Sequence, residues 1–326
     1  MFKIRYRGHI SLEDDFSIPL SWLNSNVVVS GIWQVGGKKF LRKLAQQINK
    51  EYPEIGLLYI SQLEEGLKGH YPWDAYYDIR EDALQLPYFY GNIKNVRNVE
   101  EWSAAINSSL GFSKSFEEQF VQYVQNIELP TSLTELFENF REITSKSKSL
   151  SGEDYYTLVS YCEDPDESWN KFNLTSSHEN LTWIRQLLSG KNVFIDMRNT
   201  IYQNLAFLLI LQNLRSRLPW NTSTFPRVLI FVEQGAYQLL NHQLHLGEGY
   251  SHYIQGVLET LTHKATSLII EEDQVQYLIK DLVDSAKLKV FFRSMYPSYD
   301  GFSLGEEDIR TIERLPDQEA LIYSNE

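Results

Sequence analysis

The sequence predicts an α/β fold, with an open, mainly parallel sheet and helices on both faces. Two observations lead to this prediction. Short runs of valine, isoleucine, leucine and phenylalanine recur along the chain, and segments with helical periodicity separate them. In residues 26–40, one of these runs passes through a glycine-rich turn directly into an amphipathic helix. Strands that alternate with helices over 326 residues are typical of a sheet whose connections are helical crossovers.

The first elements of the chain are an edge strand and a strand that leads into the glycine-rich turn. Residues 1–23 alternate loosely between polar and apolar types, which indicates an edge strand or a hairpin ahead of the core. Residues 27–29 are three valines, typical of a buried strand, and residues 41–52 (LRKLAQQINKEY) have the periodicity of a helix. The turn between them contains three glycines and two lysines, namely Gly31, Gly36, Gly37, Lys38 and Lys39.

This turn has the layout of a phosphate-binding loop, in which backbone N–H groups surround an oxyanion, a lysine neutralises it and a helix N-terminus adds positive charge. The P-loop pattern G-x-x-x-x-G-K-[ST] is matched incompletely. Counted from Gly31, the lysine and hydroxyl positions hold Gly37 and Lys38. Counted from Lys38, the first glycine position holds Ile32 and the hydroxyl position holds Lys39. Neither register supplies the hydroxyl that would bind Mg²⁺.

Three interpretations of the turn follow from this mismatch. The turn binds phosphate with one extra residue, it is a relic that has lost the ligand, or it is a plain glycine turn between a strand and a helix. In a relic we expect Trp33 or Val35 to fill the phosphate volume and both lysines to point to solvent.

The remaining core elements follow in the same alternating order. Residues 56–60 (GLLYI) predict a second buried strand, and the aromatic residues 72–92 predict a long ordered excursion near the carboxyl edge of the sheet. A strongly apolar helix is expected at residues 204–218. Further strands are expected at residues 191–197, 227–232, 267–270, 287–292 and 320–323.

A mostly helical region interrupts this alternation. Ser115 is expected to cap one of its helices, and the polar residues 144–151 (TSKSKSLS) are the best linker candidate. We therefore expect three parts: residues 1–98 with the N-terminal strand and the first half of the core, residues 99–188 as a helical insertion, and residues 189–326 as the second half.

Composition limits the class of protein. Apolar residues make up 43% of the chain, enough for a globular core, and the net charge of −13 disfavours broad nucleic-acid binding while leaving room for a local basic pore or groove. Cys162 is the only cysteine, which excludes internal disulfides and cysteine-based zinc sites. His242 and His245 have helix-like spacing without a third ligand, so no metal site is expected. Without a membrane-length apolar run or a signal-peptide pattern, we expect a cytoplasmic protein.

Seven stretches stand in a fixed order along the chain: GIWQVGGKKF, GLLYIS, NVFIDMRNT, VLIFVEQGAYQLL, SLIIEEDQ, KVFFRS and ERLPDQEALIY. Their order and spacing resemble those of the HerA/FtsK-type P-loop ATPases, ring-forming DNA translocases related to conjugation and DNA-packaging motors. The resemblance covers roughly residues 20–324. It implies a RecA-like P-loop NTPase core, a homo- or hetero-oligomer, and ATP with Mg²⁺ as cofactors, or no cofactor if the turn is a relic.

The resemblance also implies roles for single residues. Glu233 and Gln234 stand where the family's Walker B strand ends in paired acids. Glu233 fits either position of the pair and would be the surviving catalytic acid of an active ATPase, whereas Gln234 cannot act as a base. Arg293, at the end of a strand, is a candidate arginine finger, while Glu271 and Glu272 stand where a sensor glutamine is expected. The nucleotide-binding residues would be Gly31, Gly36, Gly37, Lys38 and Lys39. Because phosphoryl transfer depends on positioned cations, extra carboxylates and a missing Mg²⁺ hydroxyl disfavour hydrolysis.

Two functions are consistent with these features. The favoured one is a non-hydrolysing or weakly active HerA/FtsK-like subunit. It would have a structural or regulatory role in a DNA-processing, DNA-transfer or defence assembly, and it would contact DNA through a local pore or through a partner. The alternative is an ATP-driven DNA translocase or helicase subunit with a nonstandard P-loop built on Lys38 or Lys39. No dinucleotide-binding fingerprint or Ser-His-Asp motif is visible in the sequence, which disfavours other enzyme classes.

Overall fold

The computed structural model of the chain describes residues 6–13, 16–31, 36–61, 73–79, 84, 86, 96–128, 133–163, 181–197, 203–220, 225–233, 248–272, 278, 280–293 and 304–324. Trp33, Val35, Gln234, His242 and His245, on which some expectations rest, lie outside these residues. In the described parts of the chain, no helix is both long and apolar enough to cross a membrane.

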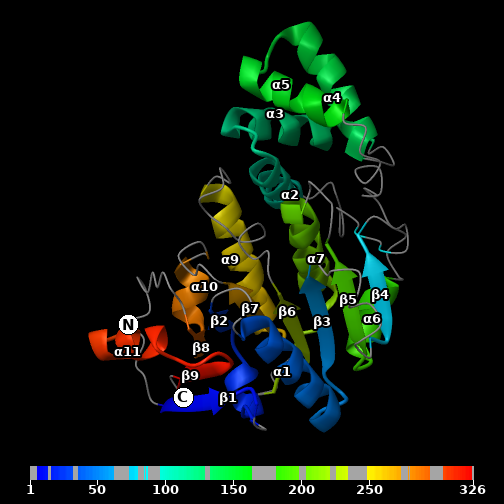
Figure 1. Cartoon of the computed structure of the whole chain (residues 1–326). Coiled ribbons are helices and arrows are strands. Elements are labelled where there is room, and N and C mark those ends of the chain that lie inside the picture. Colours follow the sequence, from blue (N-terminus) through cyan, green and yellow to red (C-terminus); the bar gives the residue numbers. More distant parts are fainter. Residues whose placement is uncertain are drawn as a thin grey trace.

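Within the described residues, nine strands form one sheet in the order β1-β9-β8-β2-β7-β6-β3-β5-β4 (Figure 1). The strands are β1 (Tyr6–Ser11), β2 (Val27–Ser30), β3 (Gly56–Ser61), β4 (Ala75–Asp78), β5 (Asn192–Asp196), β6 (Val228–Val232), β7 (Thr266–Glu272), β8 (Leu288–Phe292) and β9 (Glu319–Ser324). All neighbours from β8 to β4 pair in parallel, and only β9 runs antiparallel, to β8 and to β1. The predicted mainly parallel sheet, with a strand from the N-terminal segment at its edge, is therefore confirmed.

Helices cover both faces of the sheet, as predicted. They are α1 (Gly37–Glu51), α2 (Val96–Leu110), α3 (Lys114–Gln125), α4 (Leu133–Ser147), α5 (Gly152–Cys162), α6 (Thr182–Leu188), α7 (Gln203–Arg217), α9 (Glu248–Thr262), α10 (Lys280–Ser285) and α11 (Glu306–Glu313), with a short 3-10 helix at Leu20–Leu23. Helix α1 lies on one face, and α7, α9 and α10 lie on the other (Figure 1). The α/β fold predicted from the alternation is thus observed.

Strand pleating explains how one sheet packs against an apolar cluster on each of its faces. On β2, Val28 belongs to the apolar cluster shared with α7 and α9, while Val27 and Val29 belong to the cluster shared with α1. Helix α1 contributes residues at helical spacing, among them Leu41 and Leu44, both fully buried. This packing fixes the start of α1 next to the end of β2, which is where the glycine-rich turn lies.

Helices α2 to α5 extend beyond the sheet, above the carboxyl ends of its strands (Figure 1). Their interior is aromatic: Phe140 lies 5.2 Å, between ring centroids, from both Phe116 and Phe120. These rings belong to the same apolar cluster as Val28 and the residues of α7. The helices therefore share a continuous core with one face of the sheet.

The expected cap at Ser115 is wrong by two residues. Ser113 is the N-cap of α3, since its hydroxyl accepts a hydrogen bond of 3.2 Å from the backbone N–H of Phe116. Ser113 also donates to Asp154 on α5 at 2.7 Å, which ties the two helices together. Ser115 instead lies inside the first turn of α3 and is exposed.

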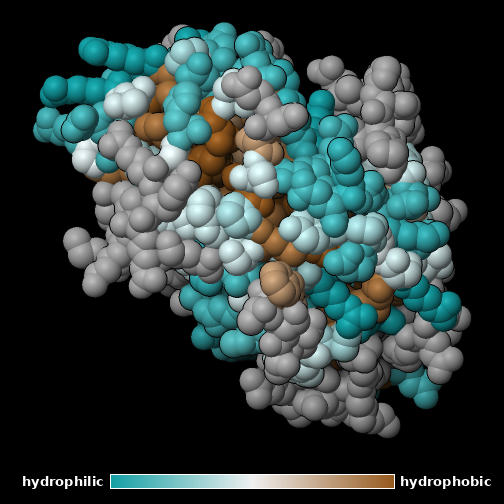
Figure 2. Space-filling view, turned by 90° about the horizontal axis from the view of Figure 1, so that it is seen from below, coloured by the Kyte–Doolittle hydropathy of each residue, from teal (hydrophilic) through white to brown (hydrophobic). Residues whose placement is uncertain are grey.

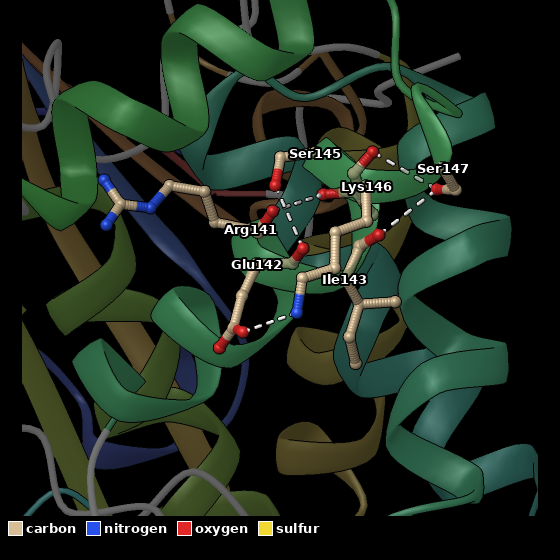
Figure 3. A network of polar contacts seen from close by, with 7 residues as sticks. Arg141, Glu142, Ile143, Ser145, Lys146 and Ser147 are labelled. Atoms are coloured by element: carbon tan, nitrogen blue, oxygen red, sulfur yellow. Dashed lines mark hydrogen bonds and ion pairs between the residues drawn. The ribbon is translucent and has the colours of Figure 1, made fainter.

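The linker expected at residues 144–151 is also wrong, because α4 continues to Ser147 (Figure 3). Ser145 donates to the carbonyl of Glu142 at 2.9 Å, and the Lys146 ammonium lies 2.6 Å from the Glu142 carboxylate. Hydroxyl groups that bond to the preceding turn and an ion pair at helical spacing keep a polar sequence helical. Only residues 148–151 connect α4 to α5.

Strand β4 was not expected within the aromatic residues 72–92. It pairs in parallel with β5 at the edge of the sheet, and its sequence AYYD lacks the aliphatic run that marks the other strands. Tyr76 on β4 stacks on Phe194 of β5 at a centroid distance of 5.4 Å. Aromatic stacking between neighbouring strands thus stabilises this edge strand, although its sequence lacks the β-branched residues from which strands are predicted.

Candidate functional site

The residues expected to carry function lie at the carboxyl end of the central strands. Gly31 follows β2, Glu271 and Glu272 end β7, Glu233 follows β6, and Arg293 follows β8. Because β2 lies between β8 and β7, and β7 lies next to β6, these four strand ends are consecutive along one edge of the sheet. Open parallel sheets bind ligands at this edge.

The glycine-rich turn joins β2 to α1. Gly36 is the N-cap of α1, since its carbonyl accepts the N–H of Phe40 at 2.8 Å, and Gly37 is the first helical residue. Lys38 and Lys39 are therefore the second and third residues of the helix. Lys38 is half-buried, whereas Lys39 is exposed and donates to the side-chain carbonyl of Gln318.

An aromatic side chain lies against both ends of this turn. A Cβ atom added to Gly31 would lie 2.5 Å from Cβ of Phe292, and one added to Gly36 would lie 2.4 Å from the Phe292 ring. Real Cβ atoms do not approach other atoms so closely, so both positions require glycine while Phe292 keeps its place. Phe292 ends β8 and is buried, with its ring 6.0 Å from that of Phe40. For a relic we expected Trp33 or Val35 to fill the phosphate volume, and both lie outside the described residues. Within the described residues, Phe292 is an aromatic side chain that lies against the turn.

A carboxylate faces the first turn of α1. A Cβ atom added to Gly37 would lie 2.8 Å from both Cγ and Oε1 of Glu271, the residue before the end of β7. Only 4% of Glu271 is exposed. A helix N-terminus carries partial positive charge from its free N–H groups, and a carboxylate placed there is stabilised by it.

Glu233 is held by three neighbouring side chains. Its Oε1 lies 2.7 Å from Nε of Arg42 on α1 and accepts the hydroxyl of Tyr59 at 3.3 Å, while its Oε2 accepts the hydroxyl of Ser61 at 2.8 Å. Glu233 is 1% exposed. Burial alone would lower the pKa of the Arg42 guanidinium, but the hydrogen bond and charge of Glu233 outweigh it and raise this pKa above its ordinary value.

Arg293 and Lys39, two further residues expected to carry function, have partners within the chain. Nη2 of Arg293 lies 2.5 Å from the carboxylate of Asp317, in the turn before β9. Gln318, next in sequence, is the partner of Lys39, so one turn contacts both cations. Asp196, at the end of β5, accepts the Tyr76 hydroxyl.

Three residues at this site were not directly indicated by the sequence. Arg42 follows Lys38 by four residues and therefore lies on the same face of α1, which is the one signal in the sequence for its position. Ser61 ends β3, and its partner Glu233 is 172 residues away. Phe292 looked like an ordinary strand residue within KLKVFF.

The ATP and Mg²⁺ that the resemblance implies do not fit these residues well. The helix start that would receive phosphate faces the Glu271 carboxylate, and Lys39 stands at the place of the Mg²⁺-binding hydroxyl. Among the described residues, no three His, Cys, Asp or Glu side chains are arranged to hold a metal ion. Next to the start of α1 the site therefore has a carboxylate where phosphoryl transfer needs positioned cations.

Two cavities lie at the opposite, amino end of the strands. Figure 2 is seen from that end and shows apolar residues reaching the surface between polar ones. One cavity, about 460 Å³, is lined by Asn26, Glu259 and Asp284 among others, and the second, about 370 Å³, by Ile55 and Phe225. Neither shares a lining residue with the strand ends described above, so they are separate from the candidate site.

Comparison with known proteins shows similarity in structure alone. No protein-family model and no curated protein matches the sequence. VirB4 of Thermoanaerobacter pseudethanolicus has a TM-score of 0.68 at 11% identity, with 92% of this chain and 86% of that chain covered. The unbound bacterial conjugative coupling protein TrwBdeltaN70 has a TM-score of 0.58 at 14% identity, with coverages of 93% and 82%. TrwB in complex with the non-hydrolysable GTP analogue GDPNP has a TM-score of 0.59 at 13% identity, with coverages of 99% and 92%.

Similarity at these identities establishes a common fold. It extends over nearly the whole chain. The chain therefore has the fold of the HerA/FtsK-type P-loop ATPases.

Proposed function

We propose that the chain is a HerA/FtsK-like subunit that does not hydrolyse ATP, or does so weakly, and that has a structural or regulatory role in a DNA-processing or DNA-transfer assembly. The observation that carries this proposal is the environment of Glu233. A carboxylate that activates water must be able to accept a proton, and Glu233 is instead bound by the Arg42 guanidinium at 2.7 Å and the Ser61 hydroxyl at 2.8 Å.

The surroundings of the glycine-rich turn support the same proposal. Lys39, at the hydroxyl position of the P-loop pattern, is engaged with Gln318, and Glu271 adds negative charge next to Gly37. Catalysis of phosphoryl transfer needs the opposite arrangement, with cations positioned around the phosphates. The fold would then serve to hold partners rather than to drive turnover.

The DNA context of the proposal comes from the fold. VirB4 and the conjugative coupling protein TrwB share it, and the TrwB structures include complexes with nucleotide analogues. In an assembly of the proposed kind, the chain would form a homo- or hetero-oligomer and meet DNA through a partner or a local pore. Arg293, ion-paired with Asp317 of its own chain, would have to exchange this partner to reach a neighbouring subunit.

The alternative, an ATP-driven DNA translocase or helicase subunit, draws support from Lys38. This lysine directly follows the helix-initiating Gly37 and is half-buried, as a phosphate-binding lysine would be. The two functions differ in turnover, so a rate measurement distinguishes them.

We expect the purified chain to release no phosphate from ATP above background, with Mg²⁺ and with or without double-stranded DNA. The reason is the bound state of Glu233 and the missing Mg²⁺ hydroxyl. A phosphate-release assay on the wild type and on Lys38→Ala tests this. DNA-stimulated turnover of about 1 s⁻¹ or faster, an ordinary enzymatic rate, that disappears in Lys38→Ala would refute the proposal and establish the alternative.

A further inference from the structure

The start of helix α1 faces a buried acid from the neighbouring strand. With a Cβ atom added to Gly37, both Cγ and Oε1 of Glu271 would lie 2.8 Å away, a separation that no real side chain at this position would allow. Glu271 is 96% buried, so its carboxylate lies within the protein rather than in solvent. Gly37 is thus the residue that makes room for Glu271.

Strand register explains why the acid lies on this side of the sheet. Glu271 pairs with Val29 of β2, and both residues point to the face that α1 covers. Ile269, two residues earlier on β7, points the same way and packs in the apolar cluster with Phe40. An apolar residue is expected at such a position, because acids are almost never fully buried without a partner. The start of α1, which carries partial positive charge, is close enough to Glu271 to contribute to its stabilisation.

An apolar side chain lies against the other two glycines of the turn. Phe292 lies against Gly31 and Gly36, the two glycines that bracket residues 32–35. Glu271 and Phe292 come from β7 and β8, the two strands that flank β2. Side chains of the protein itself therefore contact the turn at three glycines: the ring at Gly31 and Gly36, and the carboxylate at Gly37.

We infer, as an extension of the proposed non-hydrolysing function and resting on it, that the Glu271 carboxylate is an internal anion that takes the place of a phosphate group at the N-terminus of α1. A phosphoryl oxygen and a carboxylate oxygen use the same N–H groups and the same helix charge. A phosphate close to Glu271 would also meet like-charge repulsion in a buried setting, where charges are weakly screened. Phosphate-bearing ligands, nucleotides included, are excluded while Glu271 keeps its charge and place.

The inference predicts that removing the charge opens the site. Glu271→Gln preserves the size of the side chain and removes the negative charge, and Glu271→Ser also removes most of the volume. Glu272→Gln is the matched control, because Glu272 is equally buried on the next position of the strand and points to the opposite face of the sheet. Glu271→Asp, which keeps the charge, is expected to behave as the wild type.

The test is calorimetric titration of the full chain with ATP and, separately, with inorganic pyrophosphate. We expect dissociation constants above about 1 mM for the wild type and Glu272→Gln. For Glu271→Gln or Glu271→Ser we expect binding at least about tenfold tighter, which a difference of about 1.4 kcal/mol produces. Circular dichroism and thermal melts show whether Glu271→Gln and Glu271→Ser are folded. One folded variant of these two is enough for the test.

Two outcomes would overturn the inference. The first is a folded Glu271→Gln or Glu271→Ser that binds neither probe more tightly than the wild type. The second is an equal gain in Glu272→Gln, since removing any buried acid would then have the same effect. Phosphate release by the wild type is a separate measurement, so a failure of the proposed function is distinguishable from a failure of this inference.

Discussion

Replacing Arg42 with methionine is expected to destabilise the fold by about 3–5 kcal/mol, the range for a buried ion pair that loses one partner. Methionine retains much of the side chain's length, so the change chiefly removes the guanidinium. Among the described residues, Glu233, 1% exposed, then keeps the hydroxyls of Ser61 and Tyr59 as its partners. Denaturant unfolding followed by circular dichroism measures the difference in the free energy of unfolding.

Two controls separate the ion pair from general effects of removing an arginine. Arg310 forms an exposed pair with Glu306 on α11, so Arg310→Met is expected to change stability by less than about 1 kcal/mol. The double variant Arg42→Met/Glu233→Met removes both charges and is expected to recover most of the loss, because buried pairs are often replaceable by apolar residues. A loss below about 1 kcal/mol in Arg42→Met would contradict the assignment of Arg42 as the partner of Glu233.

Replacing Lys289 with methionine is expected to stabilise the fold at pH 7 by up to about 3 kcal/mol. Favourable contacts that are lost with the lysine side chain reduce this gain. Lys289 is the second residue of β8 and is 1% exposed. Burial lowers the pKa of its ammonium to about 8 from the ordinary 10.5, although the charge of Asp284 opposes this shift. Keeping a charged ammonium in this position at neutral pH therefore costs free energy, and methionine fills similar volume without the charge.

The same substitution has a pH signature. Between about pH 8 and 10.5 the unfolded chain holds the Lys289 proton and the folded chain does not, so the wild type gains stability as pH rises through this window. Below about pH 8 both states are protonated, and the contribution of this group is constant. Lys289→Met is expected to lack this rise, and Lys287→Met, which removes a half-buried lysine just before the strand, is expected to keep it. Denaturant unfolding at pH 7, 9 and 10.5 measures all three proteins, and equal pH dependence in them would contradict the prediction.

The sheet was predictable because its strands carry local signals. β2, β3 and β6 consist mainly of aliphatic and aromatic residues, as does β8 apart from Lys289, and each of these strands is buried along its whole length. Strand β4 has no such run and depends on stacking of Tyr76 on Phe194, a contact between residues far apart in sequence. The end of α4 was missed for a similar reason, since side-chain bonds to the preceding turn, such as that of Ser145, outweigh the low helix propensity of serine.

The candidate site was predictable in its location and not in its chemistry. Gly37, Glu233 and Arg293 each follow a predicted strand, and in the structure β2, β6 and β8 end at the same edge of the sheet. The contacts that decide what these residues do join distant parts of the chain, such as Arg42 with Glu233, 191 residues apart. No local pattern encodes the contact of Glu271 with Gly37, because it depends on the register of β7 against β2.

The most direct test of the account is calorimetric titration of the wild-type chain and of Lys38→Ala with ATP in the presence of Mg²⁺. Because Glu271 and Phe292 contact the glycine-rich turn, we predict no measurable heat of binding in either protein at micromolar concentrations of ATP. Micromolar binding by the wild type that disappears in Lys38→Ala would show that the turn holds nucleotide, and would contradict the account.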